Sequence, residues 1–213
     1  MTSLNIQQTK EMLLAAADAI ISSVPLLTEV DRVIGDGDHG VGIGGGMEKA
    51  KEALEKMDQP ADINSLYKNM GMAMINSMGG ASGVIFGTMF LGGVKGLPAK
   101  TELDCATMAQ MSRKSVDAIK QRGQAQVGDK TMVDAYEPAV QAMESYTGND
   151  LAEMLSAAAE AAEKGVESTK NFIAKFGRAR YLGERALGHQ DAGATSVSII
   201  ISAMRDYVKG LSA

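Results

Sequence analysis

The chain has 213 residues, enough for one large domain or two small ones with a substantial core. Its net charge is −5 and it contains no basic run, so the sequence argues against a general nucleic-acid binder. It has no basic, apolar leader and no window near the ~18 apolar residues of a membrane span, so we expect a cytoplasmic protein without membrane association. The single cysteine excludes an internal disulfide.

Composition and apolar spacing predict an all-α protein, a single domain over residues 1–213. Eight helices are expected, over about 6–24, 44–57, 63–78, 83–95, 104–122, 133–146 and 151–175, and from about 195 to the C-terminus. Asp62 is the expected N-cap of the third helix. The segment Thr195–Ser202 is rich in β-branched residues, but helical spacing continues to Leu211, which favours a helix.

The connection after the first helix is strongly acidic, with Asp31, Asp36, Asp38 and His39 set among glycines. Asp and Gly are poor in helix interiors, so we expect a loop. Oxygen ligands this close together suit a hard cation such as Mg²⁺, and crowded carboxylates repel unless cations neutralise them, which favours two ions. The alternatives are a solvated acidic turn and, for His39, a structural hydrogen bond instead of a ligand contact.

The connection after the third helix, Gly79-Gly-Ala-Ser-Gly83, offers free backbone N–H groups, a hydroxyl and a helix N-terminus. Such a combination suits phosphate. It lacks the lysine of a Walker A loop, and close helix packing is the alternative role for its glycines.

The connection after the fifth helix contains Gly128-Asp-Lys-Thr-Met132. Asp129 is interpreted as a plain N-cap of the next helix. Lys130 adds a cation, and Met132 adds an apolar side chain able to lie against a nucleobase.

The connection after the seventh helix begins with Gly177-Arg-Ala-Arg180 and ends with His189-Gln-Asp-Ala-Gly193. The guanidinium of Arg178 suits phosphate oxygens, whereas Arg185 is better explained as surface charge. In an up-and-down bundle alternate connections lie at the same end. The four unusual loops are therefore expected to meet on one rim and to form a single site.

Together the four segments resemble the nucleotide-binding L subunit of dihydroxyacetone kinases and the homologous C-terminal domain of the ATP-dependent single-chain kinases. The matching motifs, in chain order, are Asp31-x₄-Asp36-x-Asp38-His39-Gly40, Gly79-Gly-Ala-Ser-Gly, Gly128-Asp-Lys-Thr-Met and Gly177-Arg-Ala-Arg-Tyr-Leu-Gly-Glu-Arg-Ala-Leu-Gly-His-Gln-Asp-Ala-Gly-Ala-Thr-Ser. They span nearly the whole chain.

The resemblance implies an eight-helix antiparallel up-and-down barrel that carries a nucleotide, ADP or ATP, and two Mg²⁺ ions on one rim. It implies that Asp31, Asp36 and Asp38 bind the metal and that Arg178 is the catalytic residue. The residues it places around the nucleotide are His39, Gly40, Val41, Gly42, Ala81, Ser82, Gly123, Met132, Arg178, Asp191, Ala192 and Gly193. Members of the family often have Asn at the position of Gly42, so that contact is lost here.

The resemblance also implies the activity: phosphoryl transfer from Mg-bound ATP to a ketose held covalently on a separate K subunit. An M subunit of the phosphotransferase type would rephosphorylate the ADP in place, and a homodimer is compatible with the sequence. Two alternatives stay open. One is a subunit with exchangeable ATP, acting on another ketose such as erythrulose. The other is a non-catalytic helical module whose acidic loop binds Ca²⁺, although the loop lacks the spacing of an EF-hand.

Overall fold

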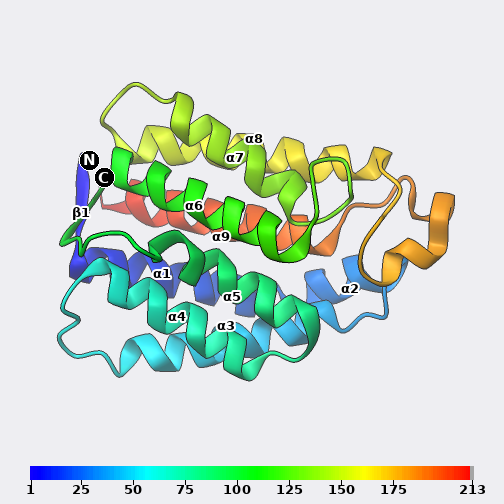
Figure 1. Cartoon of the computed structure of the whole chain (residues 1–213), viewed down its shortest axis with the longest axis horizontal. Helices are drawn as coiled ribbons and strands as arrows, with labels where there is room; N and C mark the ends of the chain where they lie inside the picture. The colour runs from blue at the N-terminus through cyan, green and yellow to red at the C-terminus, as the bar shows by residue number, and fades with distance from the viewer. Residues whose placement is uncertain (212–213) are drawn as a thin grey trace.

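The computed structural model describes residues 1–211, and within that range it is almost entirely helical (Figure 1). The α-helices are α1 Ile6–Ser22, α2 Val24–Ile34, α3 His39–Glu55, α4 Ile63–Ser77, α5 Gly80–Val94, α6 Cys105–Gly123, α7 Val133–Ser145, α8 Leu151–Ser168 and α9 Ala192–Gly210. The described residues also form two strands, β1 Ser3–Asn5 and β2 Glu102–Asp104, and two 3-10 segments, η1 Thr169–Asn171 and η2 Arg178–Ala186.

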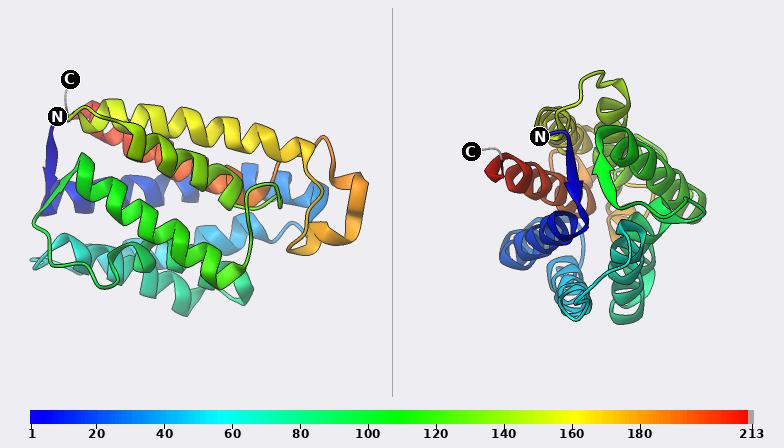
Figure 2. Two further views of the ribbon diagram at one scale, coloured as in Figure 1. Left: turned by 45° about the horizontal axis from the view of Figure 1, so that its top comes forward. Right: turned by 90° about the vertical axis from the view of Figure 1, so that its left-hand side faces the viewer.

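The eight long helices of the described residues, α1 and α3 to α9, form a closed ring, which Figure 2 shows end-on. Each packs on the long helix before and after it, and α1 closes the ring by packing on α9. The short helix α2 packs on α3 as an additional segment. Buried apolar side chains from all eight long helices form the core cluster. The predicted all-α fold, an eight-helix up-and-down barrel, is thereby confirmed.

Local side-chain caps explain where several helices begin. Asp62, Asp104 and Asp150 accept hydrogen bonds from first-turn amides of α4, α6 and α8. Asn5 forms a capping box with Gln8 at the start of α1. The predicted cap at Asp62 is confirmed, with Ser65 N as its donor at 2.7 Å.

Glycine lets α4 and α5 approach closely. A Cβ built on Gly71 would lie 2.6 Å from the backbone oxygen of Gly87, and one built on Gly87 would lie 2.7 Å from that of Gly71. Any side chain at either position would therefore push the two helices apart. These two glycines, in the middle of α4 and of α5, therefore serve helix packing.

The short ribbon of β1 and β2 was not expected from the sequence. The strands pair antiparallel, with Ser3 opposite Asp104 and Asn5 opposite Glu102. Three residues are too few for an alternating pattern to be recognisable. The ribbon joins the start of α1 to the start of α6.

The prediction of one long acidic loop was wrong. Pro25 comes soon after the end of α1, but it lies in the first turn of a further helix, α2, where its missing N–H costs no hydrogen bond. Asp31 consequently lies inside α2, and α3 begins at His39, five residues before the predicted start. A Cβ on Gly40 would lie 2.3 Å from the Thr28 hydroxyl, so this glycine packs α3 against α2.

Other boundaries shift less. The helix α5 begins at Gly80, three residues before the predicted start, and α8 ends at Ser168, well before residue 175. The segment Thr195–Ser202 lies within α9, so its predicted helical state is confirmed. Within the described range no single helix has the length and hydropathy of a membrane span. The criterion is met only by α1 and α2 taken together, across a 56° bend.

Candidate functional site

The four unusual connections meet at one end of the barrel, as predicted. In Figure 1 the α2–α3, α4–α5, α6–α7 and α8–α9 connections lie at the right, and both termini and the α3–α4, α5–α6 and α7–α8 connections lie at the left. We call the right-hand end the rim. Contacts between the connections confirm the arrangement: His39 bonds to Ser196, and Lys130 bonds to the backbone of His189.

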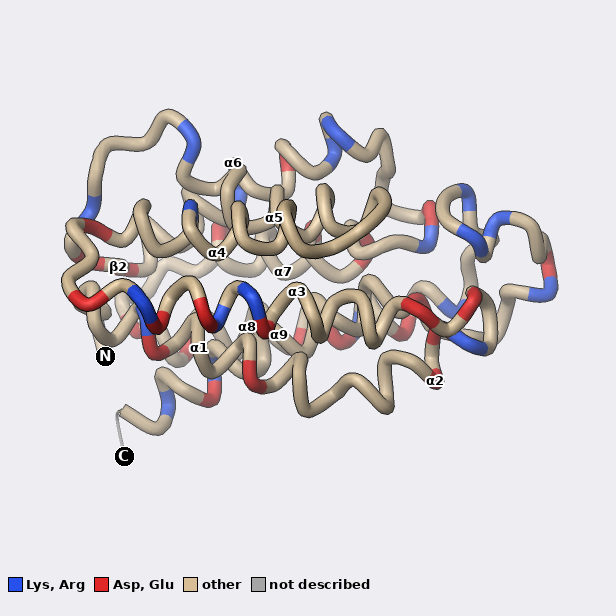
Figure 3. Tube along the Cα trace, turned by 90° about the horizontal axis from the view of Figure 1, so that it is seen from below, with Lys and Arg blue, Asp and Glu red and all other residues tan. Residues whose placement is uncertain are grey.

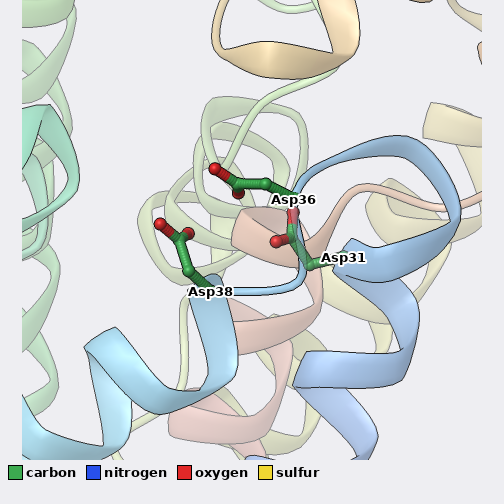
Figure 4. Close-up of side chains that lie close together, drawn as sticks. All are labelled: Asp31, Asp36 and Asp38. Carbon is green, nitrogen blue, oxygen red and sulfur yellow. The ribbon is translucent and has the colours of Figure 1, made fainter.

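The acidic cluster consists of Asp31, Asp36 and Asp38, where α2 passes into α3 (Figure 4). One carboxylate oxygen from each lies within 4.8 Å of the other two. Asp31 is held by its surroundings, because its Oδ2 accepts hydrogen bonds from the amides of Gly37 at 2.8 Å and His39 at 3.3 Å. The backbone of Gly35 passes so close that a Cβ there would lie 2.2 Å from Asp31 Oδ1.

The surroundings of Asp38 destabilise its charged form. The pKa of Asp38 is raised, first by desolvation, then by its hydrogen bond with Asp36 and by the charges of Asp36 and Asp31. A bound cation would relieve this repulsion. The donors are all oxygen and leave coordination positions open on the exposed side, which fits a hard divalent cation such as Mg²⁺.

Arg178 brings a positive charge from a distant part of the chain to this cluster. Its Nε forms an ion pair with Asp36 Oδ2, although 72% of the arginine side chain is exposed. Figure 3 shows acidic and basic positions together at the α2 end, whereas α5 carries no charged residue along its length. The α8–α9 connection is thus held over the α2–α3 junction.

His39 begins α3 and points into the protein. Its Nε2 lies 2.8 Å from Ser196 Oγ, and Ser196 donates its own proton to the Ala192 carbonyl. With the Ser196 proton directed at this carbonyl, the contact suits the tautomer that carries its proton on Nε2. Its ring centroid lies 5.8 Å from that of Phe86 in α5. Desolvation lowers the pKa of His39, which favours the neutral ring.

The residues that follow His39 have different surroundings. Gly40 is buried against α2, Val41 is 65% exposed, and a Cβ on Gly42 would meet no atom within 4 Å. Only Val41 and Gly42 of these three therefore face open space.

The N-terminus of α5 is open. Gly79 is its N-cap without a side-chain hydrogen bond, and Gly80 has a φ of +70° that favours glycine. A Cβ on either would meet no atom within 4 Å. Ala81 and Ser82 are exposed in the first turn. The amides of this turn are available to an anion.

The α6–α7 connection contradicts the predicted cap at Asp129. It is Asp134 that accepts the amides of Gly128 and Thr131, whereas Asp129 accepts the amide of Gln126 and pairs with Lys175. Asp129 thus bonds to the chain before it and not to the first turn of α7, and the next residue, Lys130, has a left-handed φ of +60°.

Gly123 and Met132 lie at the two ends of this connection. Gly123 ends α6, and a Cβ there would lie 3.2 Å from Ile85. Met132 is only 5% exposed, and a Cβ on Gly193 would lie 3.4 Å from its amide nitrogen. Met132 and Gly193 therefore lie side by side, whereas little of the methionine side chain reaches the surface.

The end of the α8–α9 connection is fixed by Asp191, the N-cap of α9, which accepts the amide of Ala194 at 2.7 Å. Desolvation raises the pKa of this carboxyl to about 7. Ala192 is buried and Gly193 is partly exposed in the first turn.

Two residues at the rim were missed by the sequence analysis as partners of the site. Ser196 orients His39, and Phe86 packs on the same ring. Both lie in apolar helical segments, where nothing in their spacing separates them from ordinary core residues. For Ser196 the sequence offers one signal, its position near the start of the helix that Asp191 caps.

The fold and the rim together define an all-helical protein with a polar site of acidic and phosphate-compatible groups at one end. The family model described as the DAK2 domain matches residues 33–206. The chain belongs to the DAK2 domain family.

The chain is similar both to proteins of about its own length and to longer proteins. The chain is 39% identical over 201 residues to "PEP-dependent dihydroxyacetone kinase, ADP-binding subunit DhaL" of Escherichia coli (strain K12), which covers 93% of this chain and 95% of that protein. It is 35% identical over 195 residues to "L-erythrulose kinase" of Pectobacterium atrosepticum, covering 89% of this chain and 33% of that protein.

A solved structure has the same fold. The dihydroxyacetone kinase from C. freundii in complex with AMP-PNP and Mg²⁺ superposes with a TM-score of 0.72 at 23% sequence identity. The match covers 93% of this chain and 33% of that one, so the barrel corresponds to about a third of the longer kinase.

Proposed function

We propose that this chain is the nucleotide-binding subunit of a dihydroxyacetone (ketose) kinase and that residues 1–213 act as one domain. The observation that carries the proposal is the meeting, at one rim, of the acidic cluster, the open N-terminus of α5 and Arg178. The name of the Escherichia coli relative, an ADP-binding subunit that matches over nearly its whole length, supports the same reading.

The metal ligands in this proposal are Asp31, Asp36 and Asp38, holding two Mg²⁺ ions. Their oxygen atoms lie close enough to share cations, and their mutual repulsion favours the loaded state. When bound, Mg²⁺ offsets negative charge on the nucleotide phosphates.

The nucleotide, ADP or ATP, is proposed to lie between the α5 N-terminus and the α6–α7 connection. Amides near Ala81 and Ser82 would receive its phosphates, and Gly123 and Met132 would border its base. The remaining proposed contacts are His39, Gly40, Val41, Gly42, Arg178, Asp191, Ala192 and Gly193. Burial of Gly40 and Met132 restricts both to backbone or edge contacts.

Arg178 is the proposed catalytic residue. Its guanidinium is exposed and reaches Asp36, so it lies beside the proposed metal ligands. As the γ-phosphoryl group passes in line to the substrate hydroxyl, this cation would stabilise the charge on the migrating group. Burial favours the neutral form of His39, and Ser196 orients its ring. His39 would therefore shape the site without adding a charge to it.

The sugar is proposed to come from a partner. A K-type subunit would present the ketose to the rim, and an M-type phosphotransferase subunit would regenerate ATP from bound ADP. The relatives named as subunits support a multi-component enzyme.

Two measurements test the proposal. Titration calorimetry of the full chain should show Mg²⁺-dependent ADP binding, which an exposed control change far from the rim, Glu160→Ala in α8, leaves intact. Ca²⁺ binding with no nucleotide binding would instead support the non-catalytic alternative.

Addition of a K-type subunit should produce ketose phosphorylation that neither protein shows alone. A chain that phosphorylates dihydroxyacetone unaided, with partner excluded by mass spectrometry, contradicts the two-subunit proposal.

A second candidate is a subunit with exchangeable ATP that acts on a different ketose. The similarity to an L-erythrulose kinase favours it. A permanent ADP cofactor must dissociate slowly, whereas a substrate must leave in each turnover. Nucleotide that copurifies and survives dialysis therefore favours the phosphotransferase version, and its complete loss favours exchange.

A further inference from the structure

Lys130 is a buried cation that the proposed reaction does not use. It lies in the α6–α7 connection, is 2% exposed, and has a left-handed backbone that turns its side chain inward. Removing an ammonium group from water is costly unless it is well hydrogen-bonded. Its partners therefore indicate what it does.

Both recorded acceptors of the Lys130 ammonium are backbone carbonyls. Nζ donates to the Thr169 oxygen at 2.6 Å and also to the His189 oxygen. Thr169 follows the last turn of α8, and His189 lies just before the cap of α9. The ammonium group thus joins the two ends of residues 169–189, which we call the excursion and which Figure 1 shows in orange beyond the barrel.

Further hydrogen bonds close the base of the excursion around this lysine. The amide of Gly188 donates to the Lys170 carbonyl at 2.7 Å, and the amide of Asp191 donates to the Thr169 hydroxyl at 3.0 Å. The charges of Asp191 and Asp134 attract the ammonium, whereas desolvation lowers the pKa of Lys130. The cation is therefore the centre of a polar cluster, not a surface group folded inward.

The outer part of the excursion, all of it within the described residues, contains no α-helix, and it contacts the barrel at α2. Just before it, Lys175 pairs with Asp129, the residue next to the buried lysine. The outer part consists of the 3-10 segment η2, interrupted at Gly183, and it is preceded by Gly177 with a φ of +63°. Arg178 at its start is largely exposed. The position of that guanidinium over the acidic cluster consequently depends on how firmly the base is held.

We propose that Lys130 is a positioning residue that fixes the excursion at its base and thereby places Arg178 over the nucleotide site. The inference rests on the proposed function, since it assigns Lys130 a role in phosphoryl transfer. It predicts that loss of the ammonium acts on turnover through Arg178, while ADP, held mainly by other residues, binds nearly as before.

The test compares Lys130→Met, which keeps the length of the side chain but removes its charge, with Lys164→Met. Lys164 pairs with Glu160 on the surface of α8, outside the excursion, and is a matched control. In the reconstituted kinase, Lys130→Met should lower kcat by about 10- to 100-fold, as small misplacements of a reacting group do. ADP affinity should change far less, and the control should change neither quantity.

A double-mutant cycle separates positioning from general damage. If Lys130 acts through Arg178, Lys130→Met added to Arg178→Ala should cause little further loss of kcat. Additive losses, or an equal loss of ADP affinity and kcat, would overturn the proposal.

Limited trypsin digestion gives a readout without activity. Cleavage after Arg178, Arg180 and Arg185 should be faster in Lys130→Met than in the wild type and the control. Unchanged cleavage also overturns the proposal.

If the wild-type chain shows no kinase activity, the proposed function fails, while digestion still tests whether Lys130 holds the base of the excursion. If Lys130→Met does not fold, Thr169→Val, which removes the hydroxyl bonded to Asp191, is used in the same assays.

Discussion

The two ends of the barrel differ in which contacts involve the side chains that define them. At the end with the termini, caps such as Asp62 and Asp104 bond to amides three residues away. At the rim, hydrogen bonds join distant segments, such as His39 to Ser196 across 157 positions. Local caps begin helices at the end with the termini, whereas the rim gathers charged residues and glycines with positive φ, and long-range contacts hold these segments together.

We therefore expect changes at the rim to impair function more than stability, and changes at the end with the termini to impair stability more than function.

The largest effect is expected for Arg178→Ala. A guanidinium directed at the migrating phosphoryl group acts mostly in the transition state, so kcat should fall by about 10³-fold, as for arginine fingers, and ADP affinity should fall less. Kinetics of the reconstituted kinase measure both. Equal losses would make Arg178 a ground-state ligand.

The next effect concerns the acidic cluster. Asp36→Ala and Asp38→Ala should each weaken Mg²⁺-dependent ADP binding by about 100-fold or more, because each removes a direct ligand, a larger change than loss of an outer-shell partner. Thermal stability should stay near the wild-type value, since both residues are exposed and repel each other. Tight Mg-ADP binding retained by either variant, measured by calorimetry, contradicts the metal assignment.

A third prediction uses pH. Asp191 has its pKa raised to about 7 by desolvation, against about 3.9 in an unfolded chain. The folded state then binds more protons, so the stabilisation is complete below pH ~4 and is lost as pH rises toward 7. Asp191→Asn should flatten this decline in the free energy of unfolding. Urea titrations between pH 4 and 8 measure it, and an unchanged slope would exclude Asp191 as its origin.

The smallest effects are expected at the end of the barrel with the termini. Asp62→Ala and Asp104→Ala each remove one N-cap and should lower the free energy of unfolding by about 1 kcal/mol. For a chain of this size the Tm should fall by about 2–4 °C, while Mg-ADP affinity stays the same. A cap variant that loses nucleotide binding while folded would show that the two ends are coupled.

Much of this protein follows from the sequence because the signals are local. Apolar spacing determined the helices, Asp62 determined a helix start, and the alternation of plain and glycine-rich connections determined that one end carries the site. These patterns depend on neighbours within a turn or two. The motifs around Asp31, Ser82 and Arg178 also carried the family resemblance, which the match to the DAK2 domain bears out.

Only the tertiary structure decided the remaining features, because they depend on contacts between distant segments. Gly40 is helical where propensity favours a loop, since close packing against α2 requires a residue without a side chain. Asp129 was expected to cap α7, but it accepts the amide of Gln126 and pairs with Lys175, contacts that depend on how the α6–α7 connection folds against the segment after α8. The burial of Lys130 beneath residues 169–189 has no periodic signal at all, since a buried lysine and a surface lysine look alike in a sequence until the segments that surround them are in place.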